Sequence, residues 1–272
     1  MHPMLNIATR AARKAGNLIV RAMDNIDYLS VDNKGRNDFV SEVDRAAERE
    51  IIHILRKAYP NHHFLGEEGG RQGKEGEAEF LWIIDPLDGT TNFLHSFPQF
   101  AVSIALMYRG QLDQAVVYDP LRQEMFTASR GSGAMLNNRR IRVSGQNSLL
   151  GSLLGTGFPF KQQEHLDAYL DMFRELFKDS AGIRRAGAAS LDLAYVACGR
   201  LDGFWEIGLQ PWDMAAGVLL IQEAGGLVSD FTGGDRYMEV GNIVAGAPKL
   251  QQTICRAISP YVSDALRESQ AS

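Results

Sequence analysis

The sequence predicts a mixed fold of helices and strands, between the α+β and α/β classes. In the first half of the chain, apolar runs at 101–107 and 113–118 lie on either side of Gly110, which is the pattern of antiparallel strands joined by a turn. From about residue 148, short apolar runs alternate with longer amphipathic ones, which is typical of strands that alternate with helices. One fold that contains both patterns is therefore expected.

A change of pattern near residue 146 divides the predicted single domain, residues 1–272, into subdomains 1–146 and 147–272. The junction has no Pro- or Ser-rich linker, and the chain shows neither repeats nor low-complexity segments. With 45% hydrophobic and 22% charged residues, the composition is that of an ordinary globular protein whose length allows a large core.

Two helices are predicted near the N-terminus. Residues 4–23 carry apolar side chains at helical spacing along one face. The polar segment 28–40 then predicts a hairpin or a loop that carries Lys34. A second helix is expected over 41–57, with its first residue as the cap and Asp44 in its first turn. For Asp44, an interaction with the helix dipole is the simple alternative to a functional role.

The remaining elements follow from shorter patterns. Further strands are expected at 124–128, 141–143, 150–156, 182–185, 203–207, 227–230 and 242–246. Further helices are expected at 163–178, 190–198, 213–223 and 248–267.

The stretch 81–93 carries most of the chemical information. Four apolar residues predict a buried strand, which ends in Asp85 and Asp88. Pro86 stiffens the corner between the two carboxylates. Gly89 lets a ligand approach the backbone, and the residues after it resemble a helix start whose free N–H groups suit an anion. Carboxylates for metal beside amides for phosphate indicate a metal-dependent phosphate site, the alternative being an ordinary Asp-rich turn.

Two further acidic positions stand beside structural signals. Glu67 follows a short predicted strand, and Glu68 after it is interpreted as a solvated loop residue. Asp213 follows Pro211 and Trp212 at a predicted helix start, where an N-cap beside a buried tryptophan is the simpler interpretation.

Charge and cysteine content exclude several classes of protein. A net charge of −5 and a pI near 5.7 argue against direct, strong nucleic-acid binding, which needs a basic face. An acidic protein that acts on phosphate esters needs metal ions to overcome repulsion. Two cysteines give no disulfide framework. The sequence shows neither a membrane-spanning run nor a signal peptide, so a cytoplasmic protein without membrane contact is expected.

The motifs together resemble one enzyme family. Asp-Pro-Leu-Asp-Gly-Thr-Thr-Asn-Phe at 85–93 resembles the signature of the inositol monophosphatase family. Gly-Glu-Glu at 66–68 stands before it at the family's position. Trp-Asp at 212–213, followed by Glu-Ala-Gly-Gly at 223–226, resembles the second family signature. The resemblance extends over essentially the whole chain.

This resemblance implies a layered αβαβα sandwich of the sugar-phosphatase type, with the site between its two halves. It also implies two to three Mg²⁺ ions. The first would be held by Glu67, Asp85 and the carbonyl of Leu87. The second would be held by Asp85, Asp88 and Asp213, and a third, loosely bound ion would contact Glu67.

The resemblance assigns further roles. Glu67, Thr90 and Asp44 would act catalytically by activating the attacking water, with Thr90 hydrogen-bonded toward Asp44. Backbone N–H groups of Gly89 and Thr90 would hold phosphate oxygens. The residues implied to bind substrate are Asp88, Gly89, Thr90, Arg184, Gly187, Ala188, Ala189, Glu206 and Asp213. Inhibition by Li⁺ at the second metal position is also implied.

Two positions depart from the family pattern. Family members often carry Thr where this chain has Ala188, so a hydroxyl contact to substrate is missing or replaced by backbone. The segment from Lys34 to Asp44 is one residue shorter than in animal relatives, so the role of Lys34 is not assigned. Neither departure affects an implied metal ligand.

The resemblance leaves functions of two classes open. One is a Mg²⁺-dependent phosphatase that acts on inositol monophosphate or related polyol and sugar phosphates, with a bisphosphate nucleotidase or fructose bisphosphatase as the nearest alternatives. The other is an interaction protein, because one bacterial subgroup implies a role in ribosomal RNA antitermination with RNA polymerase and Nus factors. A homodimer is expected in either case.

Overall fold

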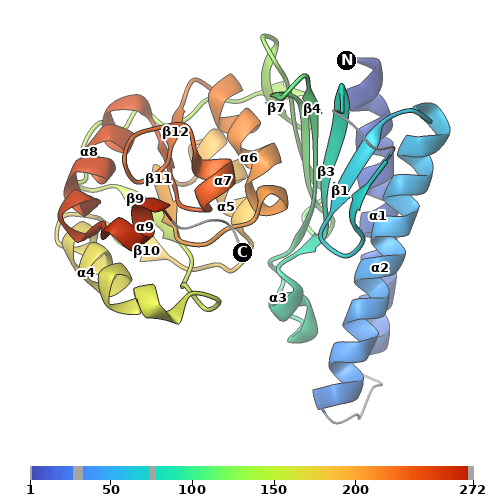
Figure 1. The fold of residues 1–272 in the computed structure, drawn as a ribbon, viewed down its shortest axis with the longest axis horizontal. Coiled ribbons are helices and arrows are strands. Elements are labelled where there is room, and N and C mark those ends of the chain that lie inside the picture. Colours follow the sequence, from blue (N-terminus) through green and yellow to red (C-terminus); the bar gives the residue numbers. More distant parts are fainter. Residues whose placement is uncertain (1, 27–32, 74–77, 269–272) are drawn as a thin grey trace.

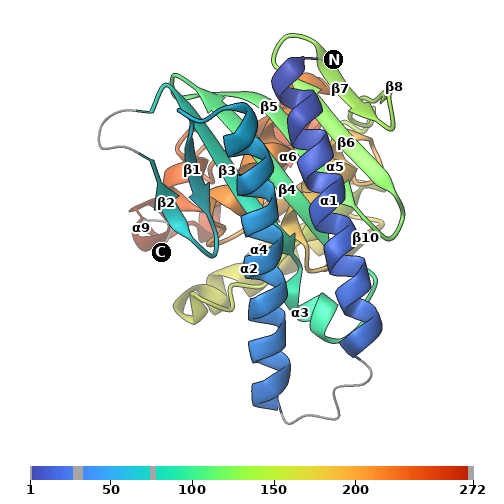
Figure 2. The same cartoon turned by 90° about the vertical axis from the view of Figure 1, so that its right-hand side faces the viewer.

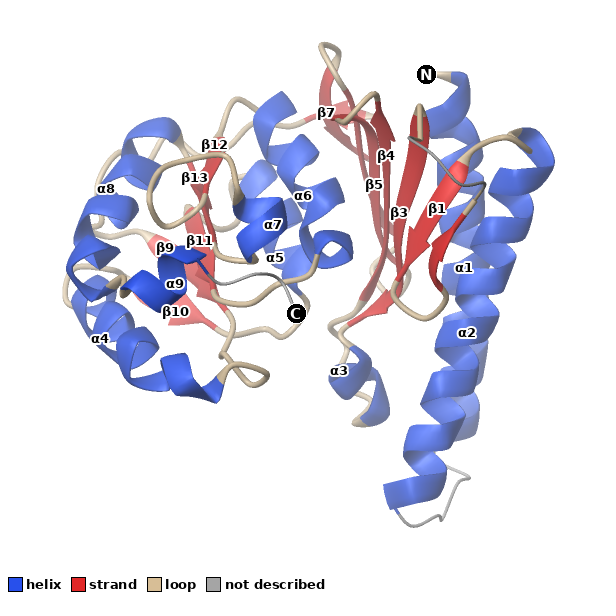
Figure 3. Cartoon of the chain, in the orientation of Figure 1, coloured by secondary structure: helices blue, strands red, loops and turns tan. Residues whose placement is uncertain are grey.

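In the computed structural model, residues 2–26, 33–73 and 78–268 are described, and those at 24–26 and 33–41 by their backbone alone. The elements stack in five layers, in the order helices, sheet, helices, sheet, helices (Figure 1, Figure 3). This arrangement confirms the αβαβα sandwich that the sequence motifs imply.

The first layer is a pair of long helices, α1 (Pro3–Ile26) and α2 (Asn33–Ala58), which run side by side across the outer face of the first sheet (Figure 2). The buried face of α1 has small side chains along its middle, among them Ala8 and Ala12, with the larger Leu5 and Ile19 toward its ends. A Cβ at Gly16 would lie 2.7 Å from the ring of Tyr118, so the close contact of this helix with the sheet depends on a glycine there.

The helix α2 begins earlier than predicted. Residues 33–40 are helical, so the predicted hairpin or loop at 28–40 is wrong for them, and its first five residues lie outside the described part. The helix contains no proline, and extending an existing helix costs less than nucleating a new one, so the polar residues before 41 continue it. Asp44 consequently lies in the helix interior rather than in the first turn, and residue 41 is not a cap.

The first sheet is antiparallel except for one parallel pair, β1 with β3. Its order is β2-β1-β3-β4-β5-β6-β7-β8. The strands are β1 (His63–Gly66), β2 (Gly70–Gln72), β3 (Phe80–Asp88), β4 (Ala101–Tyr108), β5 (Gln111–Asp119), β6 (Glu124–Ser129), β7 (Gly133–Leu136) and β8 (Arg139–Arg140). The strand predicted at 141–143 is therefore wrong, since β8 ends before it.

The middle layer consists of α5 (Ala189–Ala197) and α6 (Pro211–Glu223), which lie between the two sheets (Figure 1). Both helices are apolar on nearly every side because each packs against a sheet on both flanks. The two helices approach closely at Gly217, where a Cβ would lie 2.4 Å from Leu193.

The second sheet and its outer helices close the sandwich. The strand order is β10-β9-β11-β13-β12, with β9 (Leu153–Thr156), β10 (Gly182–Arg184), β11 (Gly203–Glu206), β12 (Leu227–Ser229) and β13 (Ile243–Gly246). Outside it pack α4 (Leu166–Phe177) and α8 (Pro248–Ile258), and the short helices are α3 (Thr90–Leu94), α7 (Tyr237–Val240) and α9 (Asp264–Glu268). The continuous helix predicted over 248–267 is wrong, because Pro260 interrupts it between α8 and α9.

Candidate active site

The site begins where the parallel pairing of β1 with β3 ends. β1 and β3 are in parallel register, with Gly66 opposite Ile84, so the next residues along, Glu67 and Asp85, meet at the same edge of the sheet. The backbone N–H of Glu67 donates to the carbonyl of Ile84 at 3.1 Å. The two carboxyl groups are close enough for the charge of Glu67 to raise the pKa of Asp85. Two carboxylates this close repel each other unless a proton or a cation lies between them.

A bulge at the end of β3 brings in a third carboxylate. The pairing of β3 with β4 shifts between Asp85 and Asp88, at the position of Pro86. The N–H of Leu87 donates to Asp85 Oδ1 at 3.0 Å, which fixes the corner. In a regular strand, residues three apart point to opposite faces, whereas here Asp88 is close enough for its charge to raise the pKa of Asp85.

The fourth carboxylate comes from the start of α6. Pro211 occupies the first turn, Gln210 is the N-cap, and Asp213 is the third residue of the helix, not its N-cap. The side chain of Asp213 accepts the N–H of Gln210 at 2.7 Å in a capping box. This contact fixes the direction of the carboxylate, which lies among the groups from the first sheet.

Burial is the largest cause that raises the pKa of each of these four carboxylates. Burial, followed by the charge of Asp213, raises the pKa of Glu67 to about 7 and that of Asp88 to about 7. Burial raises the pKa of Asp213 to about 6, against the opposing effects of the hydrogen bond from the Gln210 backbone and of the charge of Lys161. For Asp85, burial and the charge of Glu67 raise the pKa well above its usual range. Glu67 is the exposed member of the four, so water screens its charge more than it screens the charge of Asp85 or Asp88.

Asp44 lies behind this group, on α2. It is 5% exposed, and burial, followed by the charges of Glu68 and Glu67, raises its pKa to about 8. Its Oδ1 is buried without a hydrogen-bond partner among the described residues. Thr90 Oγ1 donates to the carbonyl of Leu87 at 3.0 Å, so the expected hydrogen bond from Thr90 to Asp44 is not formed.

A pocket of about 180 Å³ opens beside the carboxylates, between the first sheet and the second half of the chain. Six of the residues expected to bind substrate line it: Asp88, Gly187, Ala188, Ala189, Glu206 and Asp213. Arg184 does not line it; its guanidinium lies outside, where it donates to the carbonyl of Ile183. The neighbouring Arg185 lines the pocket instead.

A sequence comparison assigns this arrangement to a family. The model described as the inositol monophosphatase family matches residues 1–263. The chain belongs to the inositol monophosphatase family. Members of this family are phosphatases that generally depend on metal ions.

Individual members are similar over nearly their whole length. Nus factor SuhB of Pseudomonas aeruginosa is 62% identical over 270 residues, which are 98% of this chain and 100% of that protein. The crystal structure of the extragenic suppressor protein SuhB from Bartonella henselae has a TM-score of 0.87 at 46% identity and covers 94% of this chain and 98% of its own. The inositol monophosphatase from Anabaena has a TM-score of 0.85 at 40% identity, with coverages of 94% and 95%.

The carboxylates of this family member suit a hard divalent cation in their chemistry. They are oxygen ligands, and among the described residues no cation forms a salt bridge with any of the four. Asp85 and Asp88 are buried, Asp213 is half-buried and Glu67 is exposed. Within the described ranges, no three Asp, Glu, His or Cys side chains already surround one point as metal ligands. Binding an ion would therefore require side-chain rotations that bring the carboxylates together around it.

Several residues of the site were not predicted from the sequence. Arg185 lies over the rings of Phe158 and Phe160, at 5.0–5.2 Å from their centroids, at the pocket rim. Lys161, on the same loop, opposes the charge of Asp213. No sequence motif marked this loop as part of the site, although two phenylalanines beside a lysine in a loop are an unusual composition.

A glycine in the wall of the pocket and an amide side chain outside it fix the surroundings of the site. A Cβ at Gly157 would lie 1.8 Å from Glu206 Oε1, so the carboxylate of Glu206 rests directly on the glycine backbone. Asn92 Nδ2 donates to the carbonyls of Gln99 at 2.7 Å and Ala186 at 2.9 Å, which joins α3 to the loop before α5. Asn92 belongs to the first signature motif, but its partner at 186 could not be found from the sequence.

No helix in the described part of the chain is both long and apolar enough to cross a membrane.

Proposed function

We propose that this protein hydrolyses phosphate monoesters, foremost inositol monophosphate and related polyol or sugar phosphates, with Mg²⁺ as cofactor. The observation that carries the proposal is that Glu67, Asp85, Asp88 and Asp213 lie near one another with every pKa raised, and that Asp88 and Asp213 line the pocket. Family membership supports the reaction class. The carboxylates support a cofactor with hard-cation chemistry, because a phosphate would otherwise be repelled.

In this proposal the chain's oxygen ligands hold two to three Mg²⁺ ions. Glu67, Asp85 and the Leu87 carbonyl would bind the first ion, and Asp85, Asp88 and Asp213 the second, with a third contacting Glu67. Bound Mg²⁺ supplies Lewis-acid chemistry and lowers the pKa of a water ligand. The Leu87 carbonyl already accepts the Thr90 hydroxyl, and its second lone pair is available for a cation.

The chain's own groups would orient the phosphate and manage protons. The backbone at Gly89, whose φ is 93°, lets Gly89 and Thr90 present N–H groups to phosphate oxygens. Thr90, Glu67 and Asp44 would form the catalytic set. Without a metal ion, burial raises the pKa of Glu67 to about 7 and that of Asp44 to about 8, so a cation bound at Glu67 would displace a proton from it near neutral pH.

The pocket walls favour a polyol as the leaving group. Glu206 and Asp192 line the pocket and present carboxyl oxygens, which accept hydrogen bonds from hydroxyl groups. Gly187, Ala188 and Ala189 add backbone groups at the start of α5 without bulky side chains. Ala188 provides no hydroxyl, so any contact there comes from its backbone. Arg184 lies outside the pocket, and its proposed contact passes to Arg185.

The experiment compares phosphate release from inositol monophosphate, glycerol phosphate, fructose bisphosphate and a nucleoside bisphosphate, with Mg²⁺ and with excess chelator. We expect the highest kcat/KM on a monophosphate and no turnover in chelator. Full activity in chelator would refute the metal assignment. Preference for a bisphosphate would favour the bisphosphate nucleotidase or fructose bisphosphatase alternative. Li⁺ should inhibit uncompetitively toward substrate, by taking the second metal position after turnover.

A second function is favoured by the relative named Nus factor SuhB, which is 62% identical to this chain. We propose that this chain also acts in ribosomal RNA transcription antitermination, as a homodimer or monomer that contacts RNA polymerase and Nus factors in the cytoplasm. Its net charge of −5 supports contact with proteins rather than strong direct contact with nucleic acid. Co-purification of RNA polymerase with the tagged protein, at physiological salt, tests it.

A further inference from the structure

One buried carboxylate next to the site has no part in the chemistry proposed above. Glu48 lies one helical turn after Asp44 on α2, and only 4% of it is exposed. Its Oε2 accepts the backbone N–H of Glu68 at 3.0 Å, and its carboxylate also accepts the backbone N–H of Gly69. No salt bridge to Glu48 is formed among the described residues, so backbone amides rather than a cation are its partners.

Two glycines make the space for this carboxylate. A Cβ on Gly66 would lie 2.2 Å from Glu48 Oε2, and one on Gly69 would lie 2.6 Å from Oε1. Both distances are much shorter than a van der Waals contact. The Glu48 carboxylate can therefore reach the backbone only because neither position has a side chain. The carboxylate is therefore seated in a turn that begins at Gly66 and ends at Gly69.

The turn that Glu48 holds is the one that carries Glu67. The N–H of Glu67 is fixed on the other side by the carbonyl of Ile84. Glu68 turns away from the site toward α2, where its carboxylate lies 3.3 Å from the guanidinium of Arg45. With the peptides on both sides anchored and Glu68 engaged elsewhere, the side chain of Glu67 is the one left facing Asp85.

We propose that Glu48 is a positioning residue, which fixes the turn at 66–69 so that Glu67 is held in place as a ligand for a divalent cation. This inference rests on the proposed Mg²⁺ site. Glu48 itself touches neither cation nor substrate. By holding the turn in one backbone conformation, Glu48 lowers the conformational entropy that is lost when Glu67 binds an ion.

The first variant is Glu48→Gln, which keeps the size of the side chain. The single amide oxygen of Gln can accept fewer hydrogen bonds than the two carboxylate oxygens of Glu. The new NH₂ group would face a backbone N–H, and two donors cannot form a hydrogen bond with each other. We expect Mn²⁺, used as the calorimetric probe, to bind roughly tenfold more weakly. The Mg²⁺ concentration for half-maximal activity should rise by a similar factor, with kcat at saturating Mg²⁺ changed less than about twofold.

Two further variants make the test specific. Glu50→Gln removes a charge from the same helix at a position without a role in the site, and it should leave Mn²⁺ affinity unchanged. Gly69→Ala leaves Glu48 in place but pushes against its carboxylate, and it should weaken Mn²⁺ binding in the same direction as Glu48→Gln. Melting in chelator, followed by circular dichroism, checks that each variant is folded.

The outcomes separate the two proposals. If the wild-type protein binds no Mn²⁺ and needs no Mg²⁺, the proposed function fails. If the wild type depends on metal but the folded Glu48→Gln and Gly69→Ala variants bind Mn²⁺ as it does, the positioning role is refuted. A fall in kcat at saturating Mg²⁺, with unchanged Mn²⁺ affinity, would also refute it, because Glu48 would then act on the reaction rather than on ion binding.

Discussion

Asp88 Oδ2 accepts two hydrogen bonds from Ser190, one from its backbone N–H at 2.7 Å and one from its hydroxyl at 2.5 Å. The two residues are 102 positions apart in the sequence. Ser190 lies in the first turn of α5, whose N-cap residue Ala188 has no side-chain acceptor. Asp88, at the end of β3, therefore accepts a backbone N–H that has no partner within its own helix, at the start of α5 in the other half of the molecule.

Removing the Ser190 hydroxyl tests this link. Ser190→Ala keeps the backbone hydrogen bond, so we expect a loss of about 1.5 kcal/mol in the free energy of unfolding, the cost of a hydrogen bond to a charged group. Activity should fall less than about tenfold because Asp88 keeps one of its two anchors. Urea unfolding and phosphate release measure the two effects. Ser132→Ala, on an exposed turn, is the matched control; an equal loss in both variants would contradict the prediction.

Asp213→Asn separates the fold from the metal site. The amide oxygen of Asn can still accept the N–H of Gln210, so the start of α6 should be preserved. The loss of one negative charge should weaken the second metal position and lower activity roughly 100-fold or more. Circular dichroism should show a native spectrum. A variant that retains wild-type activity at limiting Mg²⁺ would exclude Asp213 as a ligand.

The raised pKa values predict an unusual dependence of stability on pH. Asp44 has its pKa raised from 3.8 to about 8, and Asp88 from 3.8 to about 7. At a pH between the ordinary pKa of 3.8 and the raised pKa of the folded protein, the native state keeps protons that the unfolded chain has already released. Stability in chelator should therefore be highest in acid and fall as pH rises through these values, by up to roughly 1.4 kcal/mol per pKa unit.

Mg²⁺ should reverse this trend, since it binds carboxylates that have lost their protons. We expect the increase in Tm caused by Mg²⁺ to be small at about pH 5.5 and several degrees larger at about pH 8.5. Differential scanning calorimetry at both pH values, with chelator and with Mg²⁺, provides the four Tm values. A Tm in chelator that rises steadily from acid to alkaline pH would show that these carboxylates are not destabilising when charged.

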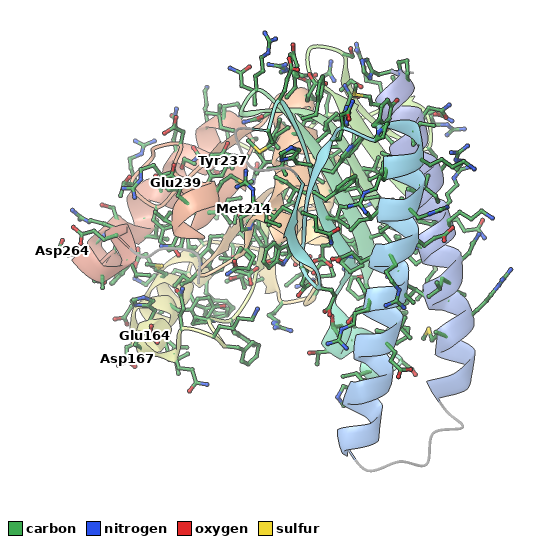
Figure 4. The ribbon with its side chains drawn as sticks, turned by 45° about the vertical axis from the view of Figure 1, so that its right-hand side comes forward. Glu164, Asp167, Met214, Tyr237, Glu239 and Asp264 are labelled. Atoms are coloured by element: carbon green, nitrogen blue, oxygen red, sulfur yellow. The ribbon has the colours of Figure 1, made fainter. Side chains whose placement is uncertain are left out.

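Catalysis and partner binding should be separable by mutation. Asp88→Asn acts inside the pocket and should abolish hydrolysis while RNA polymerase still co-purifies. Arg184→Glu acts outside the pocket and should weaken co-purification while hydrolysis continues. Asp264→Lys, on the outer surface at α9, controls for a charge reversal as such (Figure 4). If a folded Asp88→Asn protein loses both activities, the two functions share one site.

Local sequence patterns determined much of this protein. The apolar strand before Asp85, the corner at Pro86 and the helix start near Asp213 were predictable because each depends on neighbouring residues. The two signature motifs predicted the layered fold as well. Where local signals were wrong, as at 33–40 and at the end of α8, the error concerned where a helix begins or ends, which depends on weak preferences.

Only the tertiary structure decided which distant residues meet. The contact of Asp88 with Ser190 depends on how α5 packs against the first sheet, and the seat of Glu48 depends on where α2 crosses the turn after β1. The choice of Arg185 over Arg184 for the pocket rim likewise follows from the direction in which the chain leaves β10. Periodicity shows which face of an element is buried, but the packing of the layers sets which groups face each other, because that depends on contacts made throughout the core.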